Sequence, residues 1–193
     1  MKKLLCLLLS ILMLLSFAAC ESADDDDDDR RSSRKSGKNQ SSEASSDYKD
    51  AIDLLMKVSE CDISEKELKS MFPDFIWEYY EEEEGESFDE ICEMISESLA
   101  EQRTDLEEEF GEDVALQYEV TDKTEVDEEE FEEYKNTMAE QYGVDPEIFG
   151  ECYTVEFEAT MSGEYEEESQ NMTYHVVEID GTWYIAEILL EGF

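Results

Sequence analysis

The chain has 193 residues, of which 56 are acidic and 14 are basic, and its formal net charge is −42 at pH 7. A field of this sign repels phosphate backbones, which proteins bind through Lys and Arg, so the composition excludes nucleic acid as a partner. From Tyr48 onward, 47 acidic side chains stand against seven basic ones. Such a surface attracts basic proteins or peptides and divalent cations; the alternative is a solvated coat that confers solubility.

Residues 1–19 are predicted to be a lipoprotein signal peptide. Lys2 and Lys3 precede an almost unbroken apolar stretch at residues 4–17, which is shorter than the roughly 20 residues that a membrane-spanning helix needs. Residues 16–20 resemble a bacterial lipobox. The resemblance implies a diacylglycerol on Cys20 that anchors the chain at the extracellular face of the cell membrane. The alternatives are an ordinary secreted protein and an uncleaved amino-terminal anchor.

Residues 20–47 are predicted to be the lipidated cysteine followed by a disordered, charged, Ser-rich tether. The segment after Cys20 has eight serines and no aromatic residue, so it cannot bury enough surface to offset the entropy of ordering. As a flexible coil it would hold the domain roughly 30 Å from the membrane. The six aspartates at residues 24–29 lack the spacing and the glycine of an EF-hand loop, which favours a solvated spacer over a calcium site.

The first half of the remaining chain predicts helices. Apolar side chains recur at helical spacing from Tyr48 to about Cys61. Ser64 with Glu67, and Ser87 with Glu90, are the Ser-x-x-Glu pairs that open a helix. The helix after Ser87 is expected to end at Gly111, and a further helix is expected at residues 73–85.

The second half predicts mainly strands. Apolar and polar residues alternate at residues 114–120, 153–161 and 172–176, and a last strand is expected at residues 183–190. Asp180-Gly181 is a hairpin signal before that strand. One helix, capped by Asp127 with Glu130, is expected between the first two strands and would end at Gly143.

These elements predict one acidic α+β domain at residues 48–193, with helices packed on one face of a curved four-stranded antiparallel sheet. The order of elements and the closing segment "IDGTWYI" at residues 179–185 resemble small surface lipoproteins of Gram-positive bacteria. The resemblance implies an NTF2-like or cystatin-like cone. It implies the fold and no activity, and it carries over no functional residues.

Few residues suggest chemistry. His175 is the only histidine and is expected on a sheet face, because a lone histidine cannot supply the usual metal cluster. Cys152 falls on the polar phase of its strand. Cys61, Cys92 and Cys152 are nevertheless expected to be buried small side chains, and the alternative is a disulfide between Cys61 and Cys92. Five tyrosines are either core residues or the lining of a pocket inside the cone: Tyr118, Tyr134, Tyr153, Tyr174 and Tyr184.

The sequence thus predicts a non-enzymatic, lipid-anchored binding domain with Cys20 as the attachment site and without a cofactor or a metal site. The alternatives are an enzyme with a pocket in the cone and an acidic surface protein without a specific ligand. The membrane is expected to be a partner only through the lipid on Cys20.

Overall fold

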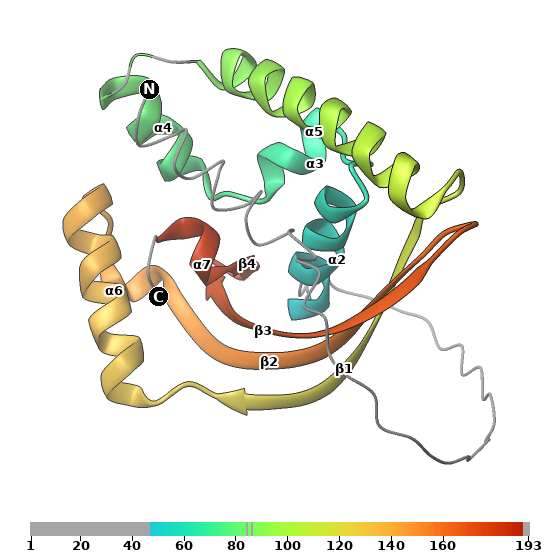
Figure 1. Ribbon diagram of the computed structural model, residues 1–193. Helices are drawn as coiled ribbons and strands as arrows, with labels where there is room; N and C mark the ends of the chain where they lie inside the picture. The colour runs from blue at the N-terminus through green and yellow to red at the C-terminus, as the bar shows by residue number, and fades with distance from the viewer. Residues whose placement is uncertain (1–46, 84, 86, 191–193) are drawn as a thin grey trace, which may run out of the picture.

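The computed structural model describes residues 47–83, 85 and 87–190, and within them helices pack on a curved antiparallel sheet (Figure 1). This arrangement confirms the predicted α+β class. The predicted signal peptide at residues 1–19, Cys20 and the tether up to residue 46 lie outside the described residues. Among the described helices, none combines the length and the apolar composition of a membrane-spanning segment.

The sheet has the strand order β1-β2-β3-β4, with every neighbouring pair antiparallel. Its strands are β1 (Ala115–Glu125), β2 (Phe149–Ser162), β3 (Glu167–Ile179) and β4 (Thr182–Ile185). Alternate residues of β2 from Val155 to Met161 are buried, whereas Glu156 and Glu158 between them are exposed. The period of two in the sequence therefore separates an inner face from an outer face.

The hollow of the sheet holds α2 (Tyr48–Ser59), and beyond it lie α3 (Glu65–Ser70) and the long α5 (Phe88–Phe110) (Figure 1). The remaining helix of this half is α4 (Asp74–Glu83). Both Ser-x-x-Glu pairs form capping boxes, in which Ser64 and Ser87 accept from the backbone N–H groups of Glu67 and Glu90. The local signals in the sequence thus identified where α3 and α5 begin.

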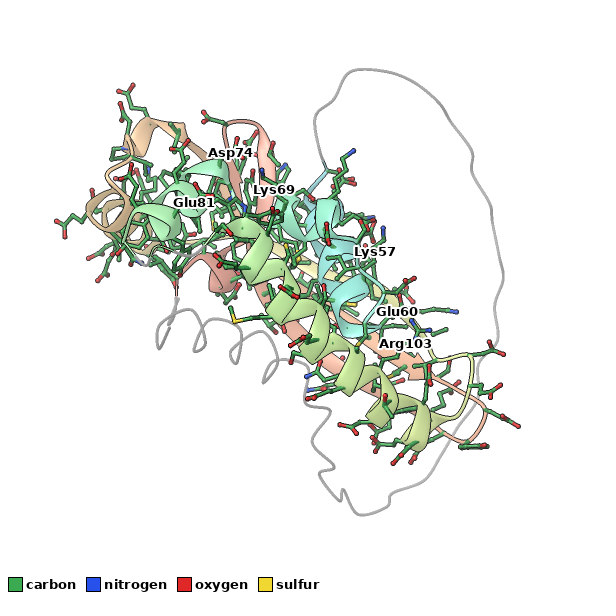
Figure 2. All side chains as sticks on the ribbon, turned by 90° about the horizontal axis from the view of Figure 1, so that it is seen from above. Lys57, Glu60, Lys69, Asp74, Glu81 and Arg103 are labelled. Atoms are coloured by element: carbon green, nitrogen blue, oxygen red, sulfur yellow. The ribbon has the colours of Figure 1, made fainter. Side chains whose placement is uncertain are left out.

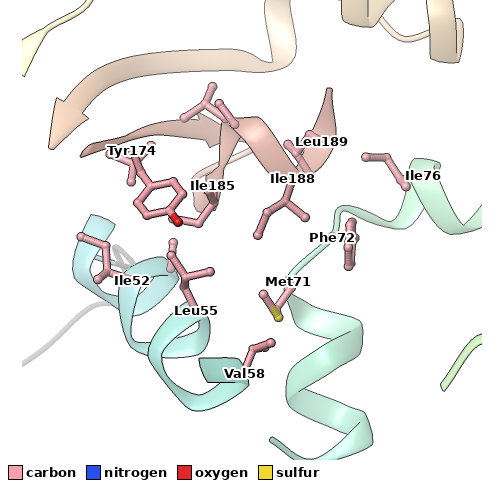
Figure 3. Close-up of a cluster of buried hydrophobic side chains, with 14 of the residues drawn as sticks. Ile52, Leu55, Val58, Met71, Phe72, Ile76, Tyr174, Ile185, Ile188 and Leu189 are labelled. Carbon is pink, nitrogen blue, oxygen red and sulfur yellow. The ribbon is translucent and has the colours of Figure 1, made fainter. Parts of the chain in front are cut away.

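The core lies between α2, the inner face of the sheet and the chain around α3 and α4. Figure 3 shows Ile52 and Leu55 of α2 facing Tyr174 of β3 and Ile185 of β4, with Met71 and Phe72 closing one side. Ile52 and Leu55 are fully buried. A buried aliphatic side chain of this size contributes about 1.5–3 kcal/mol relative to exposure, so this contact holds the helical layer on the sheet.

The chain departs from the predicted last strand at residues 183–190. β4 ends at Ile185, and the chain turns into the short helix α7 (Ala186–Leu189). Ala186, Ile188 and Leu189 are all buried. In a strand, successive side chains point to opposite faces, so the neighbours Ile188 and Leu189 could not both be buried against the same core. Burial of three nearly consecutive apolar residues therefore favours a helical turn.

The helix α6 (Glu128–Tyr142) connects β1 to β2 and is followed by a 3-10 turn at Pro146–Ile148. It lies at the end of the sheet where β2 begins (Figure 1), and its buried Tyr134 contacts Phe149 with ring centroids 6.1 Å apart. Asp127 caps it by accepting from the backbone N–H of Glu129, and Gly143 ends it in the left-handed conformation. Both ends lie where the sequence predicted them.

Candidate functional site

Carboxylates project in all directions from the described domain (Figure 2), and most of its basic side chains are held by neighbours. Lys57 pairs with Glu67, Arg103 with Glu107, and Lys135 with Glu132. Lys69 lies over the ring of Phe88, with its ammonium 5.2 Å from the centroid. The basic groups therefore neutralise their own surroundings, and they leave most of the acidic surface uncompensated.

The outer face of the sheet, which points away from α2, brings carboxylates into direct opposition. Glu119 of β1 is the register partner of Glu158 of β2, and Asp122 is the partner of Glu156. All four side chains are exposed. Like charges directly opposite one another across two strands are unfavourable, so this carboxylate row has an electrostatic reason to accept a cation.

An aromatic cage lies at the opposite face, where the start of α2 meets the sheet. We define it by Tyr48, Tyr153 and Trp183. Trp183 stacks on Tyr153 with ring centroids 5.5 Å apart, and it meets Tyr48 edge-on at 6.4 Å. The two tyrosine rings are thus the walls of the cage, and Trp183 supports both.

The ammonium of Lys123 occupies the cage. It lies 3.4 Å from the centroid of the Tyr153 ring and 4.5 Å from that of Tyr48, within the roughly 6 Å range of a cation–π interaction. Lys123 stands on β1 opposite Val155 and two residues from the register partner of Tyr153. The register of β1 and β2 therefore places the cation over the ring.

Carboxylates surround this cage. The hydroxyl of Tyr153 donates to Glu151 at 2.8 Å, and this hydrogen bond, more than burial, raises the pKa of Tyr153 to about 12. Glu125 and Glu178 act on the same hydroxyl electrostatically. Three acidic side chains thus act on the Tyr153 hydroxyl of a cage that holds one lysine, so the local charge stays negative.

His175 lies on β3, as predicted, but it has a specific partner that the sequence did not reveal. Oε1 of Glu187 in α7 accepts from the backbone N–H of His175 and is 2.8 Å from the ring Nδ1. The pairing of β4 with β3 ends at Ile185 and Val176. The Glu187 carboxylate accepts from the next backbone N–H of β3, that of His175, and so replaces the missing strand there. The hydrogen bond raises the pKa of His175, with a further contribution from Glu130.

The five tyrosines are mostly packed against other rings rather than gathered around one space. Tyr118 and Tyr174 lie on either side in contact with Phe157, with centroid distances of 5.8 Å in both cases. Tyr134 belongs to α6 and Tyr153 to the aromatic cage, while Tyr184 is half-buried on β4. The geometry favours the core interpretation over a common tyrosine-lined pocket.

Cys61, Cys92 and Cys152 are free thiols. The structure therefore does not contain the alternative Cys61–Cys92 disulfide.

Burial raises the pKa of Cys92 to about 11 and that of Cys152 to about 12, which keeps both as unreactive thiols. The assignment of Cys152 to the polar phase of its strand is wrong. Cys152 is only 3% exposed, because α6 lies against this position: Tyr134 and Glu130 of α6 are both near its thiol.

Within the described ranges, no three His, Cys, Asp or Glu side chains are arranged to hold a metal ion. Cys20, the predicted lipid attachment site, lies outside those ranges. Sequence reasoning missed the aromatic cage because Lys123 and Tyr48 are separated by 75 positions and each looks ordinary in its own segment. Simple alternation from Tyr118 and Val120 would place Lys123 on the outer face. The register shift between Val120 and Asp122 reverses the phase of β1 and puts Lys123 on the inner face, opposite Val155.

The chain was compared with protein-family models, with curated proteins and with solved structures, and none of the three comparisons gave a match.

Proposed function

We propose that this chain is a lipid-anchored protein of the extracellular membrane face, attached through a diacylglycerol on Cys20, whose acidic domain is a non-enzymatic module that binds a basic protein or peptide. The opposed carboxylates of the outer face carry the proposal. Glu119 and Glu158 are exposed register partners, as are Asp122 and Glu156. A cationic partner relieves a repulsion that the free domain has to sustain.

The long-range charge supports the same conclusion. Carboxylates that outnumber basic groups by 40 from Tyr48 onward attract a polycation before contact, and steering of this kind raises association rates by about 10- to 1000-fold at low salt. The field also repels nucleic acid and the anionic membrane surface. The tether would keep the domain roughly 30 Å from that surface, which leaves its faces accessible to a partner.

The anchor is tested by mass spectrometry of the membrane fraction of cells that express the full chain. We expect a mature chain that begins at Cys20 and carries the mass of a diacylglycerol on that residue. In a Cys20→Ala variant, the protein should leave the membrane fraction. A mature Cys20 without lipid would contradict the anchoring part of the proposal.

The binding role is tested by titrating the purified lipidated protein, in an uncharged detergent, with decalysine. We expect binding at low ionic strength that weakens at least tenfold on going from about 0.01 M to about 1 M NaCl, since the Debye length falls from about 30 Å to about 3 Å. Decaglutamate is the control peptide and should not bind. Absence of decalysine binding at low salt would refute this role.

A double variant locates the binding. Glu119→Gln with Glu158→Gln removes one opposed pair from the outer face, and we expect it to bind decalysine more weakly than the wild type. The matched control is Glu140→Gln with Glu147→Gln, which removes the same charge from exposed positions outside the sheet face. Equal weakening by both variants would show that only net charge matters and would contradict a site on the outer face.

A further inference from the structure

The aromatic cage holds a cation of this chain in the way that a receptor holds a cationic ligand. Two tyrosine rings from distant segments approach one ammonium, and Trp183 packs against both rings. The cage is partly accessible, because Tyr48, Tyr153 and Trp183 are all half-buried. A solvent-accessible ring face beside carboxylates is a favourable environment for any alkylammonium group.

We propose that the aromatic cage is a recognition site for a lysine side chain of a basic partner, and that Lys123 occupies it as an internal substitute while the partner is absent. The inference rests on the proposed binding of a basic protein or peptide. It adds a second contact with that partner, on the opposite face from the carboxylate row, and it names the residue type recognised there and how Lys123 regulates that contact.

The choice of lysine follows from the present occupant. The ammonium of Lys123 lies 3.4 Å from the centroid of one wall and 4.5 Å from that of the other, so the dimensions of the cage suit an ammonium on an alkyl stem. A partner lysine brings the same group and the same stem. Ring contacts of this kind change affinity by a few-fold at exposed sites and by about thirtyfold when they are desolvated.

Lys123 is well suited to leave the cage. It is exposed and lies on β1, which is an edge strand of the sheet, so its side chain can turn into solvent without disturbing the core. The carboxylates of Glu125, Glu151 and Glu178 remain around Tyr153, and they attract the incoming ammonium. While Lys123 fills the cage, a partner lysine cannot enter. The apparent association constant of the partner lysine is therefore its intrinsic value multiplied by the fraction of time for which the cage is empty.

The experiment uses the lipidated full chain in an uncharged detergent, labelled with 5-fluorotryptophan. Only Trp77 and Trp183 are tryptophans, so the fluorine spectrum has two signals. Trp183 reports on the cage, and Trp77, which is 7% exposed and donates to the carbonyl of Lys69, is an internal reference. The probes are two neutral-capped pentapeptides, Gly-Ser-Lys-Ser-Gly and the same peptide with norleucine in place of lysine.

We expect the lysine peptide to shift the Trp183 signal and to bind Lys123→Met at least fivefold more tightly than the wild type, because the internal competitor is gone. The norleucine peptide should shift neither signal. Lys66→Met is the matched control, since it removes the same charge from an exposed position of α3 and should leave the cage affinity unchanged. Lys123→Gln is a second variant in case Lys123→Met fails to fold.

Three outcomes overturn the inference: an affinity that is unchanged or lower in both Lys123 variants, an equal gain in Lys66→Met, or equal binding of the norleucine peptide. The proposed function is judged separately by decalysine and its salt dependence. Loss of decalysine binding with an intact response of Lys123→Met to the lysine peptide would refute the acidic-surface role alone. The reverse result would refute the cage alone.

Discussion

Cys61 adopts a backbone conformation that its side chain disfavours. It follows α2 with φ 54°, and the backbone N–H groups of Cys61 and Asp62 donate to the carbonyls of Val58 and Lys57. This is the Schellman arrangement, in which glycine is the usual residue because the left-handed region costs other residues about 1 kcal/mol. The helix end is therefore a point of stored local strain.

Replacing Cys61 tests that strain. Cys61→Gly is expected to be more stable than Cys61→Ala by about 1 kcal/mol, since both lose the thiol and only glycine relieves the conformation. The measurement is the free energy of unfolding in urea for both variants. Glu101→Gly against Glu101→Ala, at an exposed position inside α5, is the control, and there glycine should be the less stable of the two by about 1 kcal/mol. Equal stability of Cys61→Gly and Cys61→Ala would refute the strain.

His175 makes the stability of the domain depend on pH through Glu187. Its pKa is raised, first by the hydrogen bond to Glu187 and then by the negative charges of Glu187 and Glu130. A raised histidine pKa means that the folded state binds the proton more tightly than the unfolded chain does. The contribution is therefore complete below the unfolded pKa of about 6.5, and it is lost as the pH rises through the folded pKa.

The His175 pKa can be read directly, because the chain has no other histidine. The ring proton signals should titrate above the ordinary value of about 6.5. In urea, the wild type should lose more stability between pH 6 and pH 9 than His175→Gln does. A ring that titrates below the ordinary value would contradict the role of Glu187.

At the scale of elements, Gly163 joins the turn between β2 and β3 to the end of α5. The backbone N–H of Tyr165 donates to the carbonyl of Phe110 at 2.9 Å. A Cβ atom on Gly163 would lie 2.7 Å from the Cβ of Phe110 and closer still to its carbonyl oxygen. Only a residue without a side chain allows this contact between helix and turn.

Gly163→Ala should therefore cost about 1–3 kcal/mol, the usual range for overpacking a closely packed site. Gly150→Ala is the matched control, because its Cβ would meet mainly the carboxylate end of Glu178, which is flexible. Thermal unfolding of the two variants compares them. A smaller loss for Gly163→Ala than for Gly150→Ala would contradict the close approach of α5 and the turn.

At the scale of the molecule, charge opposes the compact state. The surplus of 40 carboxylates from Tyr48 onward is only locally offset by ion pairs such as Lys57 with Glu67 and Arg103 with Glu107. Exposed pairs of this kind contribute little stability. The apolar core, with residues such as Ile52 and Phe157 fully buried, has to overcome the remaining repulsion.

Screening should consequently stabilise the domain. The melting temperature is expected to rise by several degrees between about 0.01 M and about 1 M NaCl, because the Debye length shortens from about 30 Å to about 3 Å. Millimolar calcium chloride should have a similar effect at a lower concentration. Calorimetry at both ionic strengths provides the measurement, and a melting temperature that responds to neither salt would contradict the argument.

Local signals in the sequence were sufficient for most elements. Ser64 and Ser87 with their glutamates begin α3 and α5, and Asp180-Gly181, both with positive φ, forms the predicted hairpin turn. These features depend on residues within one turn of each other, so they can be recognised without the fold. The last strand was predicted too long, because burial against the core, rather than local alternation, decides the conformation of α7.

Periodicity, helix caps and charge are properties of neighbouring residues, so the class of fold, the acidic character and the boundaries of most elements could be predicted from the chain alone. Which distant residues meet depends on how the elements pack. The tertiary structure brought Lys123 to Tyr48 and Tyr153, Glu187 to His175, and Glu119 to Glu158. Strand register and the curvature of the sheet create these contacts. Both depend on how separate segments pair, so neither can be predicted from one segment of the chain.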